Sequence, residues 1–195
     1  MKIDPEQITH LIRSRRSLKP EKFLKGKIVP ENVVREMLEN ATWAPTHGFT
    51  EPWRFMVFSG EGIEKLARFQ AGLYKEKAGE SFLENKYQKL QQTPLNASHV
   101  IAICMKRQES KKIAEIEEVE AVACAVQNMM LTAAAHGVVA FWGSGGITYW
   151  EEAKPFFNLD PDDKLLGYLY IGYPSIELPK GTRKPIDEKV VWVNK

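Results

Sequence analysis

Two kinds of apolar pattern alternate along the chain, one with helical spacing and one of short continuous runs. A first helix is predicted to begin at Pro5, behind the capping residue Asp4, and to end near Arg13. A second helix is predicted from Pro30, because apolar residues recur at helical spacing until Pro45 stops the pattern. A turn-rich stretch then separates these helices from the rest of the chain.

Further segments have helical spacing. Residues 62–79 and 115–136 are predicted helices, and the second is the longest, acidic in its first turns and rich in alanine. Its small side chains indicate a central helix that packs closely against other backbones. Residues 80–96 are more charged and are the best candidate for a mobile cover. A short helix is predicted within residues 148–157.

Continuous apolar runs predict the strands. Residues 54–59, 99–105, 138–142 and 165–174 fit buried strands, and residues 189–193 fit a terminal strand that needs a partner. The predicted fold class is therefore α+β, with long helices around a sheet. The terminal strand could add to the sheet of a neighbouring subunit.

Composition fits one compact domain over residues 1–195. The 195 residues are 44% hydrophobic and 27% charged, without an internal repeat or a Gly/Ser linker. No apolar run is long enough for a membrane span, and the polar start lacks the apolar stretch of a signal peptide, so we expect a cytoplasmic protein. Cys104 and Cys124 lie among apolar residues, which predicts small buried side chains rather than a disulfide. No metal-ligand cluster is evident.

Charge is distributed unevenly. The net charge of +2 argues against a nucleic-acid-binding protein, which usually has a sustained basic surface. Residues 13–27, however, contain seven Lys or Arg and one Glu. Such a local cluster suits one small anion better than a polymer.

Two basic segments could bind that anion. Arg15, Arg16, Ser17 and Lys19 offer guanidinium groups and a hydroxyl that match the oxygens of a phosphate monoester. Arg183, within an Arg-Lys-Pro sequence near the C-terminus, could add a further charge. Taken alone, each segment also fits a solvated basic loop, which is the commoner case.

Two turn segments could approach a planar ligand. The proline-fixed backbone of Pro45 and Thr46 can present polar groups to a ring edge, and His47 can stack or donate a hydrogen bond, although a lone loop histidine is more often a surface residue. The sequence Trp-Gly-Ser-Gly-Gly at 142–146 lets a ligand approach the backbone. It is not a dinucleotide fingerprint, because Thr148 stands where a third glycine is needed.

The order of these motifs resembles the flavin-dependent nitroreductase family in its short form. The shared features are RRS after the first helix, a helix that ends in AP, EPWRF, WGSGG, GYLYIGYP, and RKP before a terminal VVW. Together they span nearly the whole chain. Two departures are Glu51, where Gln is usual before Pro-Trp, and Trp43, where some short members have Arg.

The resemblance implies a mostly antiparallel central sheet, an intertwined homodimer, and FMN bound in a cleft between the two subunits. By this resemblance, the RRS segment and the C-terminal arginine contact the phosphate and the ribityl chain, and Lys19 contacts the pyrimidine edge of the flavin. The WGS turn and the partner's APTH turn contact the flavin ring. The residues implied at the cofactor are Arg15, Arg16, Ser17, Lys19, Pro45, Thr46, His47, Trp142, Gly143, Ser144 and Arg183.

The implied activity is that of an FMN-dependent oxidoreductase. Electrons would pass from NADH or NADPH to a nitroaromatic, a quinone or a similar small acceptor by a ping-pong mechanism, and Lys19 would stabilise negative charge on the reduced flavin. No side chain is required as a catalytic base, because the flavin carries the redox chemistry. The alternatives are a protein that binds FMN without NAD(P)H turnover, a specialised flavin dehalogenase, and a dimerisation protein with incidental basic loops and no flavin. Neither a nucleic-acid nor a membrane partner is expected.

Overall fold

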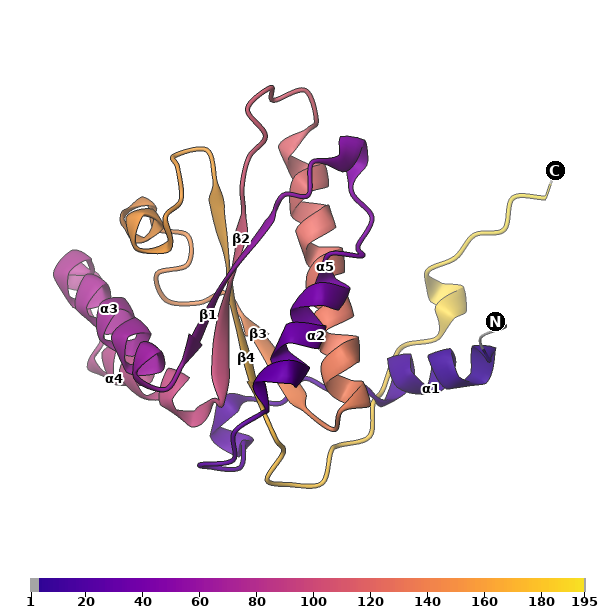
Figure 1. Ribbon diagram of the computed structural model, residues 1–195, viewed down its shortest axis with the longest axis horizontal. Coiled ribbons are helices and arrows are strands. Elements are labelled where there is room, and N and C mark those ends of the chain that lie inside the picture. The colour runs from indigo at the N-terminus through magenta and orange to yellow at the C-terminus, as the bar shows by residue number, and fades with distance from the viewer. Residues whose placement is uncertain (1–3, 195) are drawn as a thin grey trace.

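The computed structural model describes residues 4–194 and contains one four-stranded antiparallel sheet (Figure 1). The strand order is β1-β2-β4-β3. All seven residues of β2 are buried, as expected for a central strand with a continuous apolar sequence. The strands are β1 (Trp53–Ser59), β2 (His99–Met105), β3 (Val139–Gly143) and β4 (Lys164–Gly172).

Helices cover both faces of this sheet. The helices α2 and α5 lie on one face, and α3 and α4 lie on the other (Figure 1). Each helix layer encloses its own hydrophobic core against the sheet. The bounds are α1 (Pro5–Ser14), α2 (Glu31–Ala41), α3 (Glu61–Lys77), α4 (Glu84–Gln92) and α5 (Glu115–Ala135), with short 3-10 turns between them.

The predicted helices and the four internal strands are confirmed in kind and order, with small corrections, whereas residues 189–193 form no strand in the described part of the chain. The helix expected within 148–157 is a 3-10 helix, Glu151–Phe157. The cap of α1 is confirmed, because the Asp4 side chain accepts a hydrogen bond from the Glu6 amide. The prediction that both cysteines are buried is wrong for Cys124, which is exposed, whereas Cys104 is buried. The segment around Cys124 is apolar in sequence, but this position falls on the outward face of α5.

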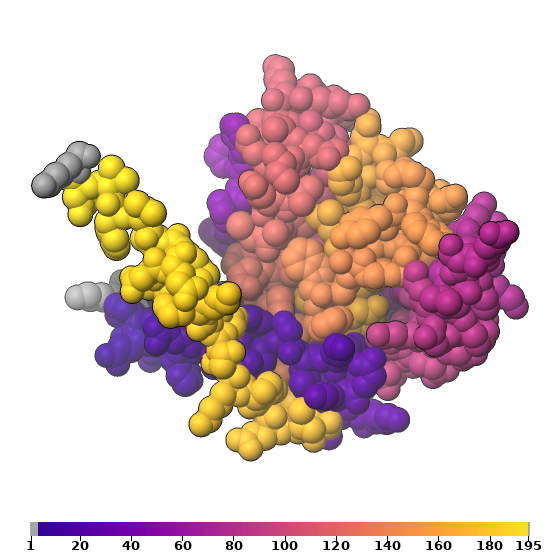
Figure 2. Space-filling view, turned by 180° about the vertical axis from the view of Figure 1, so that it is seen from behind, coloured from indigo at the N-terminus to yellow at the C-terminus, as the bar shows by residue number. Residues whose placement is uncertain are grey.

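The C-terminal tail, residues 175–194, is exposed and lies over the N-terminal segment (Figure 2). The strand predicted at 189–193 pairs with no strand of the described chain, and Val191, Trp192 and Val193 are about four-fifths or more exposed. Addition of this segment to a neighbouring sheet therefore stays a prediction. No helix within residues 4–194 is long and apolar enough to cross a membrane.

Candidate functional site

The basic loop that follows α1 lies against the edge of the sheet. Arg15 is the C-cap of α1: its amide still donates to the Leu11 carbonyl at 3.2 Å, but its ψ of 131° turns the chain out of the helix. Its Nη1 donates to Ser17 Oγ at 3.3 Å. Ser17 forms a parallel bridge with Ala140 of β3, and the Leu18 amide donates to the Ala140 carbonyl. The loop is thus fixed two residues before Trp142.

Both ends of the chain contribute to one group of positive charges. Burial, followed by the charges of Arg183 and Arg16, lowers the pKa of Arg15 below its ordinary value. Among residues 4–194, none of these three arginines has a carboxylate within ion-pair distance. We call Arg15, Arg16 and Arg183 the cationic cluster. Like charges held together without a counter-charge provide a site for an anion.

Arg16 differs from the other members of this cluster, because its guanidinium is bound to the backbone. Its Nε donates to the Pro179 carbonyl at 2.7 Å, and its Nη1 donates to the Arg13 and Arg15 carbonyls at 2.6 and 2.9 Å. A Cβ at Gly181 would lie 2.6 Å from Arg16 Nη2. Arg16 therefore ties the C-terminal tail to the basic loop and so brings Arg183 toward Arg15.

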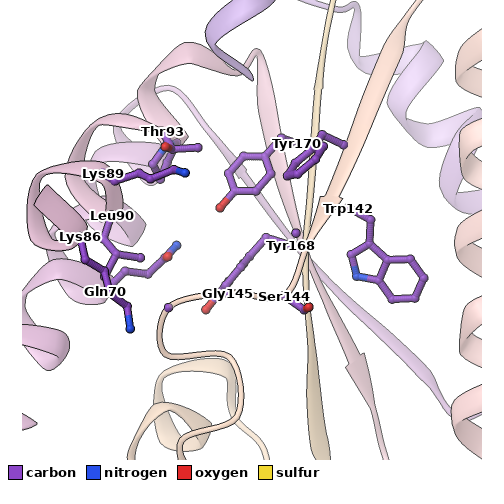
Figure 3. Close-up of a pocket in the computed structure, with 14 residues that line it drawn as sticks. Gln70, Lys86, Lys89, Leu90, Thr93, Trp142, Ser144, Gly145, Tyr168 and Tyr170 are labelled. Carbon is purple, nitrogen blue, oxygen red and sulfur yellow. The ribbon is translucent and has the colours of Figure 1, made fainter. Parts of the chain in front are cut away.

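A pocket of about 540 Å³ opens between the sheet and the helices α3 and α4 (Figure 3). Its volume is within the range of small-molecule sites. The glycine loop, residues 143–146, forms one side, and α4, from the segment predicted as a mobile cover, forms another. The lining residues are Gln70, Lys86, Lys89, Leu90, Thr93, Pro94, Phe141, Trp142, Gly143, Ser144, Gly145, Gly146, Tyr168 and Tyr170.

Two buried polar groups in this pocket lack a partner. Within residues 4–194, neither Gln70 Nε2 nor Tyr168 Oη has a hydrogen-bond partner, although each residue is only 1% exposed. Buried polar groups are normally paired, so both atoms suit a bound ligand that presents acceptors. Burial also raises the pKa of the Tyr168 and Tyr170 phenols, which moves their ionisation still further from neutral pH. A planar ring with carbonyl or nitrogen acceptors, such as a flavin, fits this donor set.

Trp142 faces the other side of the sheet from the two tyrosines (Figure 3). Its indole Nε1 donates to the Leu166 carbonyl at 3.0 Å. Gly143 and Ser144 follow directly and lie at the rim of the pocket. The predicted ring-binding turn thus lies at a cavity, at the end of β3, the strand to which Ser17 of the basic loop is bridged.

The segment Pro45–His47 does not join this pocket in its own chain. The His47 ring nitrogen Nδ1 forms a hydrogen bond with the Glu117 carboxylate at the start of α5. Trp43 and Phe49 flank the segment and are 79% and 90% exposed. The expectation that Pro45, Thr46 and His47 approach the cofactor of a partner subunit stays a prediction.

The two other residues singled out by sequence have simple environments. Lys19 is exposed and precedes the turn Pro20–Lys22. Glu51 is exposed and has a positive φ of 42°, and its amide donates to Thr46 Oγ1 at 3.3 Å. The backbone of Glu51 thus holds the turn, and its carboxylate lies outside the pocket lining.

Sequence reasoning missed the α3 and α4 side of the pocket. Gln70 lies among the buried face of α3, next in spacing to Leu66, Ala67 and Tyr74. A lone amide on an apolar helical face is the signal that could have identified it. Lys89 gave no such signal, because charged residues on exposed helices are common.

Comparison with known proteins is consistent across sequence and structure. The sequence profile described as "Nitroreductase family" matches residues 12–173. "Putative NAD(P)H nitroreductase YfhC" of Bacillus subtilis strain 168 is 32% identical over 180 residues, which are 92% of this chain and 90% of that protein. Iodotyrosine deiodinase 1 of Sus scrofa is 24% identical across 96% of this chain and 69% of its own length.

Two solved structures share the fold. A nitroreductase-like family protein from Bacillus cereus superposes with a TM-score of 0.81 at 28% identity, covering 100% of both chains. The FMN-dependent nitroreductase NfnB from Mycobacterium smegmatis, solved in complex with NADPH, superposes with a TM-score of 0.72 at 19% identity, covering 98% of this chain and 100% of that one. Since the family profile covers most of the sequence, and a relative above 30% identity spans nearly all of it, the chain belongs to the nitroreductase family.

Proposed function

We propose that this protein is an FMN-dependent oxidoreductase that passes electrons from NADH or NADPH to a small acceptor, such as a nitroaromatic or a quinone. The observation that carries the proposal is the position of an uncompensated cationic cluster beside β3, the strand that leads into the pocket. The similarity to the putative NAD(P)H nitroreductase YfhC supports the same activity.

Several residues of the chain would hold the cofactor. Arg15, Ser17 and Arg183 can bind the phosphate, because they offer charged and neutral donors in one place. Gly143 and Ser144 would lie along the flavin ring. FMN, when bound, supplies the transfer of hydride and electrons.

The remaining contributions of the protein are electrostatic and steric. The charge of Lys19 would favour the anionic reduced form of the cofactor, since opposite charges attract. The aromatic and aliphatic lining of the pocket, such as Phe141 and Leu90, limits the access of water.

A second copy of the chain would complete the site as a homodimer. Pro45, Thr46 and His47 lie outside their own pocket, and the exposed Trp43 and Phe49 beside them provide apolar surface for a partner. Sedimentation of the flavin-loaded protein tests this assembly. A monomer that retains one FMN per chain at high dilution would contradict it.

The activity is tested by the absorption spectrum of the purified protein, followed by anaerobic titration with NADH and NADPH. We expect a flavin spectrum that one equivalent of reduced nicotinamide bleaches, and a nitroaromatic or quinone should restore it. A yellow protein that is not bleached would indicate FMN binding without turnover. If the protein binds no FMN even when FMN is supplied in excess, the proposal is overturned.

A matched pair of variants ties the result to the cationic cluster. Arg15→Gln should weaken FMN binding strongly, because it removes a charged donor to the phosphate. Arg13→Gln removes a charge of the same kind from the exposed face of α1, and we expect little change. Equal effects of the two substitutions would show that the phosphate is bound elsewhere.

A further inference from the structure

The turn that lies outside its own pocket is bound to the start of α5. The short helical turn His47–Phe49 lies next to the first turn of α5 (Figure 1). The His47 imidazole forms a hydrogen bond through Nδ1 with the carboxylate of Glu117, which is 70 positions away in sequence. The imidazole is nevertheless 63% exposed, so the rest of the ring is open to a second molecule.

Buried contacts fix the segment from which the Glu117 carboxylate extends. The next residue, Glu118, forms an ion pair with Arg107, and the two side chains are only 1% and 10% exposed. Arg107 also donates through Nη2 to the Ile113 carbonyl at 2.7 Å. A Cβ at Gly48 would lie 3.5 Å from Ile113 Cδ1, so the turn packs against the same segment. Glu117 therefore extends from a rigid support.

The backbone of the turn is also held in one shape. Phe49 and Glu51 have positive φ values of 53° and 42°, which residues other than glycine seldom adopt. The Glu51 amide donates to Thr46 Oγ1 at 3.3 Å, which closes the turn. With the backbone fixed, the direction of the His47 ring depends on its bond to Glu117.

The same bond determines which ring nitrogen carries the proton. A carboxylate accepts hydrogen bonds, so the imidazole Nδ1 is the donor. In a neutral imidazole this leaves Nε2 as an acceptor. Nε2 has no hydrogen-bond partner among residues 4–194. A ligand with an N–H or O–H group would supply one, and FMN has both, in its ring imide and its ribityl hydroxyls.

We propose that Glu117 is a positioning residue for the contact between His47 and the cofactor. By accepting the Nδ1 proton, Glu117 fixes the direction and the tautomer of the ring, so that Nε2 accepts a hydrogen bond from FMN in the pocket of a second copy of the chain. The inference rests on the proposed function, in which this turn completes the partner's site. Glu117 acts only through His47 and does not contact the cofactor.

The first test measures FMN dissociation constants at pH 8 by fluorescence titration. Glu117→Gln keeps the size of the side chain, but its amide can donate to Nδ1 and so favours the other tautomer. We expect this substitution to weaken FMN binding about fivefold, as for the loss of one hydrogen bond. In a protein that already carries His47→Ala, Glu117→Gln should change the Kd by less than about twofold.

A second histidine–carboxylate pair provides the matched control. His136 Nε2 bonds to the Glu36 carboxylate at 2.9 Å, at the opposite end of α5. Glu36→Gln removes an exposed carboxylate of the same kind and should leave the Kd for FMN within about twofold of the wild-type value.

The second test observes the tautomer directly in the FMN-loaded protein. Nitrogen NMR of protein labelled with 15N-histidine, at pH 8, should show the His47 proton on Nδ1 and none on Nε2. Glu117→Gln should move the proton toward Nε2, whereas Glu36→Gln should not. The His47 signals are assigned by their loss in His47→Ala.

Different outcomes separate this inference from the proposed function. If wild-type protein binds no FMN, the proposed function fails and the inference fails with it. The inference alone is overturned by intact FMN binding with any of three results: a Kd unchanged by Glu117→Gln, additive losses in the double variant, or a His47 proton on Nε2 in the wild-type protein.

Discussion

Arg16 should control the affinity for FMN without touching the cofactor. The Arg16 guanidinium donates to the Pro179 carbonyl of the C-terminal tail, and Arg183 lies four residues further along that tail. Replacing Arg16 by alanine removes this bond, so Arg183 should lose its fixed position near Arg15. The expected result is weaker binding of FMN by a protein whose core is intact.

The size of the effect follows from the bonds that are lost. Of the three hydrogen bonds of Arg16, only the one from Nε to the Pro179 carbonyl joins the tail, and it is solvent-exposed. A hydrogen bond from a charged group contributes about 1.5–3 kcal/mol, and exposure favours the lower end. A loss of about 1.4 kcal/mol corresponds to about a tenfold weaker Kd.

A double-mutant cycle with Arg183 checks this reasoning. FMN dissociation constants are measured for Arg16→Ala, Arg183→Ala and the double variant by fluorescence titration. If Arg16 acts by positioning Arg183, Arg16→Ala should change the Kd for FMN little in a protein that already carries Arg183→Ala. Additive losses would refute the positioning role and would instead support direct contact between Arg16 and the phosphate. Arg13→Ala, which keeps the backbone carbonyl that Arg16 uses, serves as the control.

Three further predictions concern stability and reactivity. Glu118→Gln should lower the free energy of unfolding by about 3–5 kcal/mol in urea denaturation, because it leaves the nearly buried Arg107 charge without its partner; a loss below about 1 kcal/mol would contradict this. Cys124 should react with a thiol reagent in the native protein, whereas Cys104, whose pKa burial raises to about 12, should react only after unfolding; two reactive thiols in the native state would refute this assignment. Burial lowers the pKa of His99 below its ordinary 6.5, so the unfolded state binds the proton more readily, and thermal stability should fall as the pH drops below about 6.5; His99→Gln should reduce that fall, and an identical pH profile would exclude His99 as a cause.

The fold could be predicted from local patterns because each buried strand has a continuous apolar sequence and each long helix has periodic apolar positions. The match at β2, His99–Met105, is complete for this reason. Solvent exposure at a single position was harder to predict. Cys124 has apolar neighbours in sequence, yet α5 buries only the face that contains residues such as Ala121, Ala125 and Met129.

The candidate site was predictable where chemistry and local sequence coincide, as at Arg15 and the glycine loop. It was not predictable where a contact depends on tertiary structure. Arg16 has the same charge as Arg15 and is adjacent to it, but only the folded chain shows that its Nε donates to the Pro179 carbonyl of the tail and its Nη1 to two carbonyls of its own segment. Gln70 is an intermediate case: its amide stands alone on the apolar face of α3, which is a signal in the sequence, but its position opposite β4 depends on tertiary structure.

The pairing of β3 with β4 explains how a short glycine-containing turn can be held in one place. The register between β2 and β4 shifts at Ile103, which leaves Leu166 outside the regular pairing, and the Leu166 carbonyl accepts the indole N–H of Trp142. The next residue, Gly167, has a φ of 119°, and a Cβ there would lie 2.4 Å from the Gly143 carbonyl oxygen. Glycine is therefore required in β4 so that β3 can approach at the point where the pocket begins. The bulge and this glycine together fix Trp142 and Gly143 through the sheet, so the position of the predicted ring-binding turn depends on strand pairing more than on the flexibility of the turn itself.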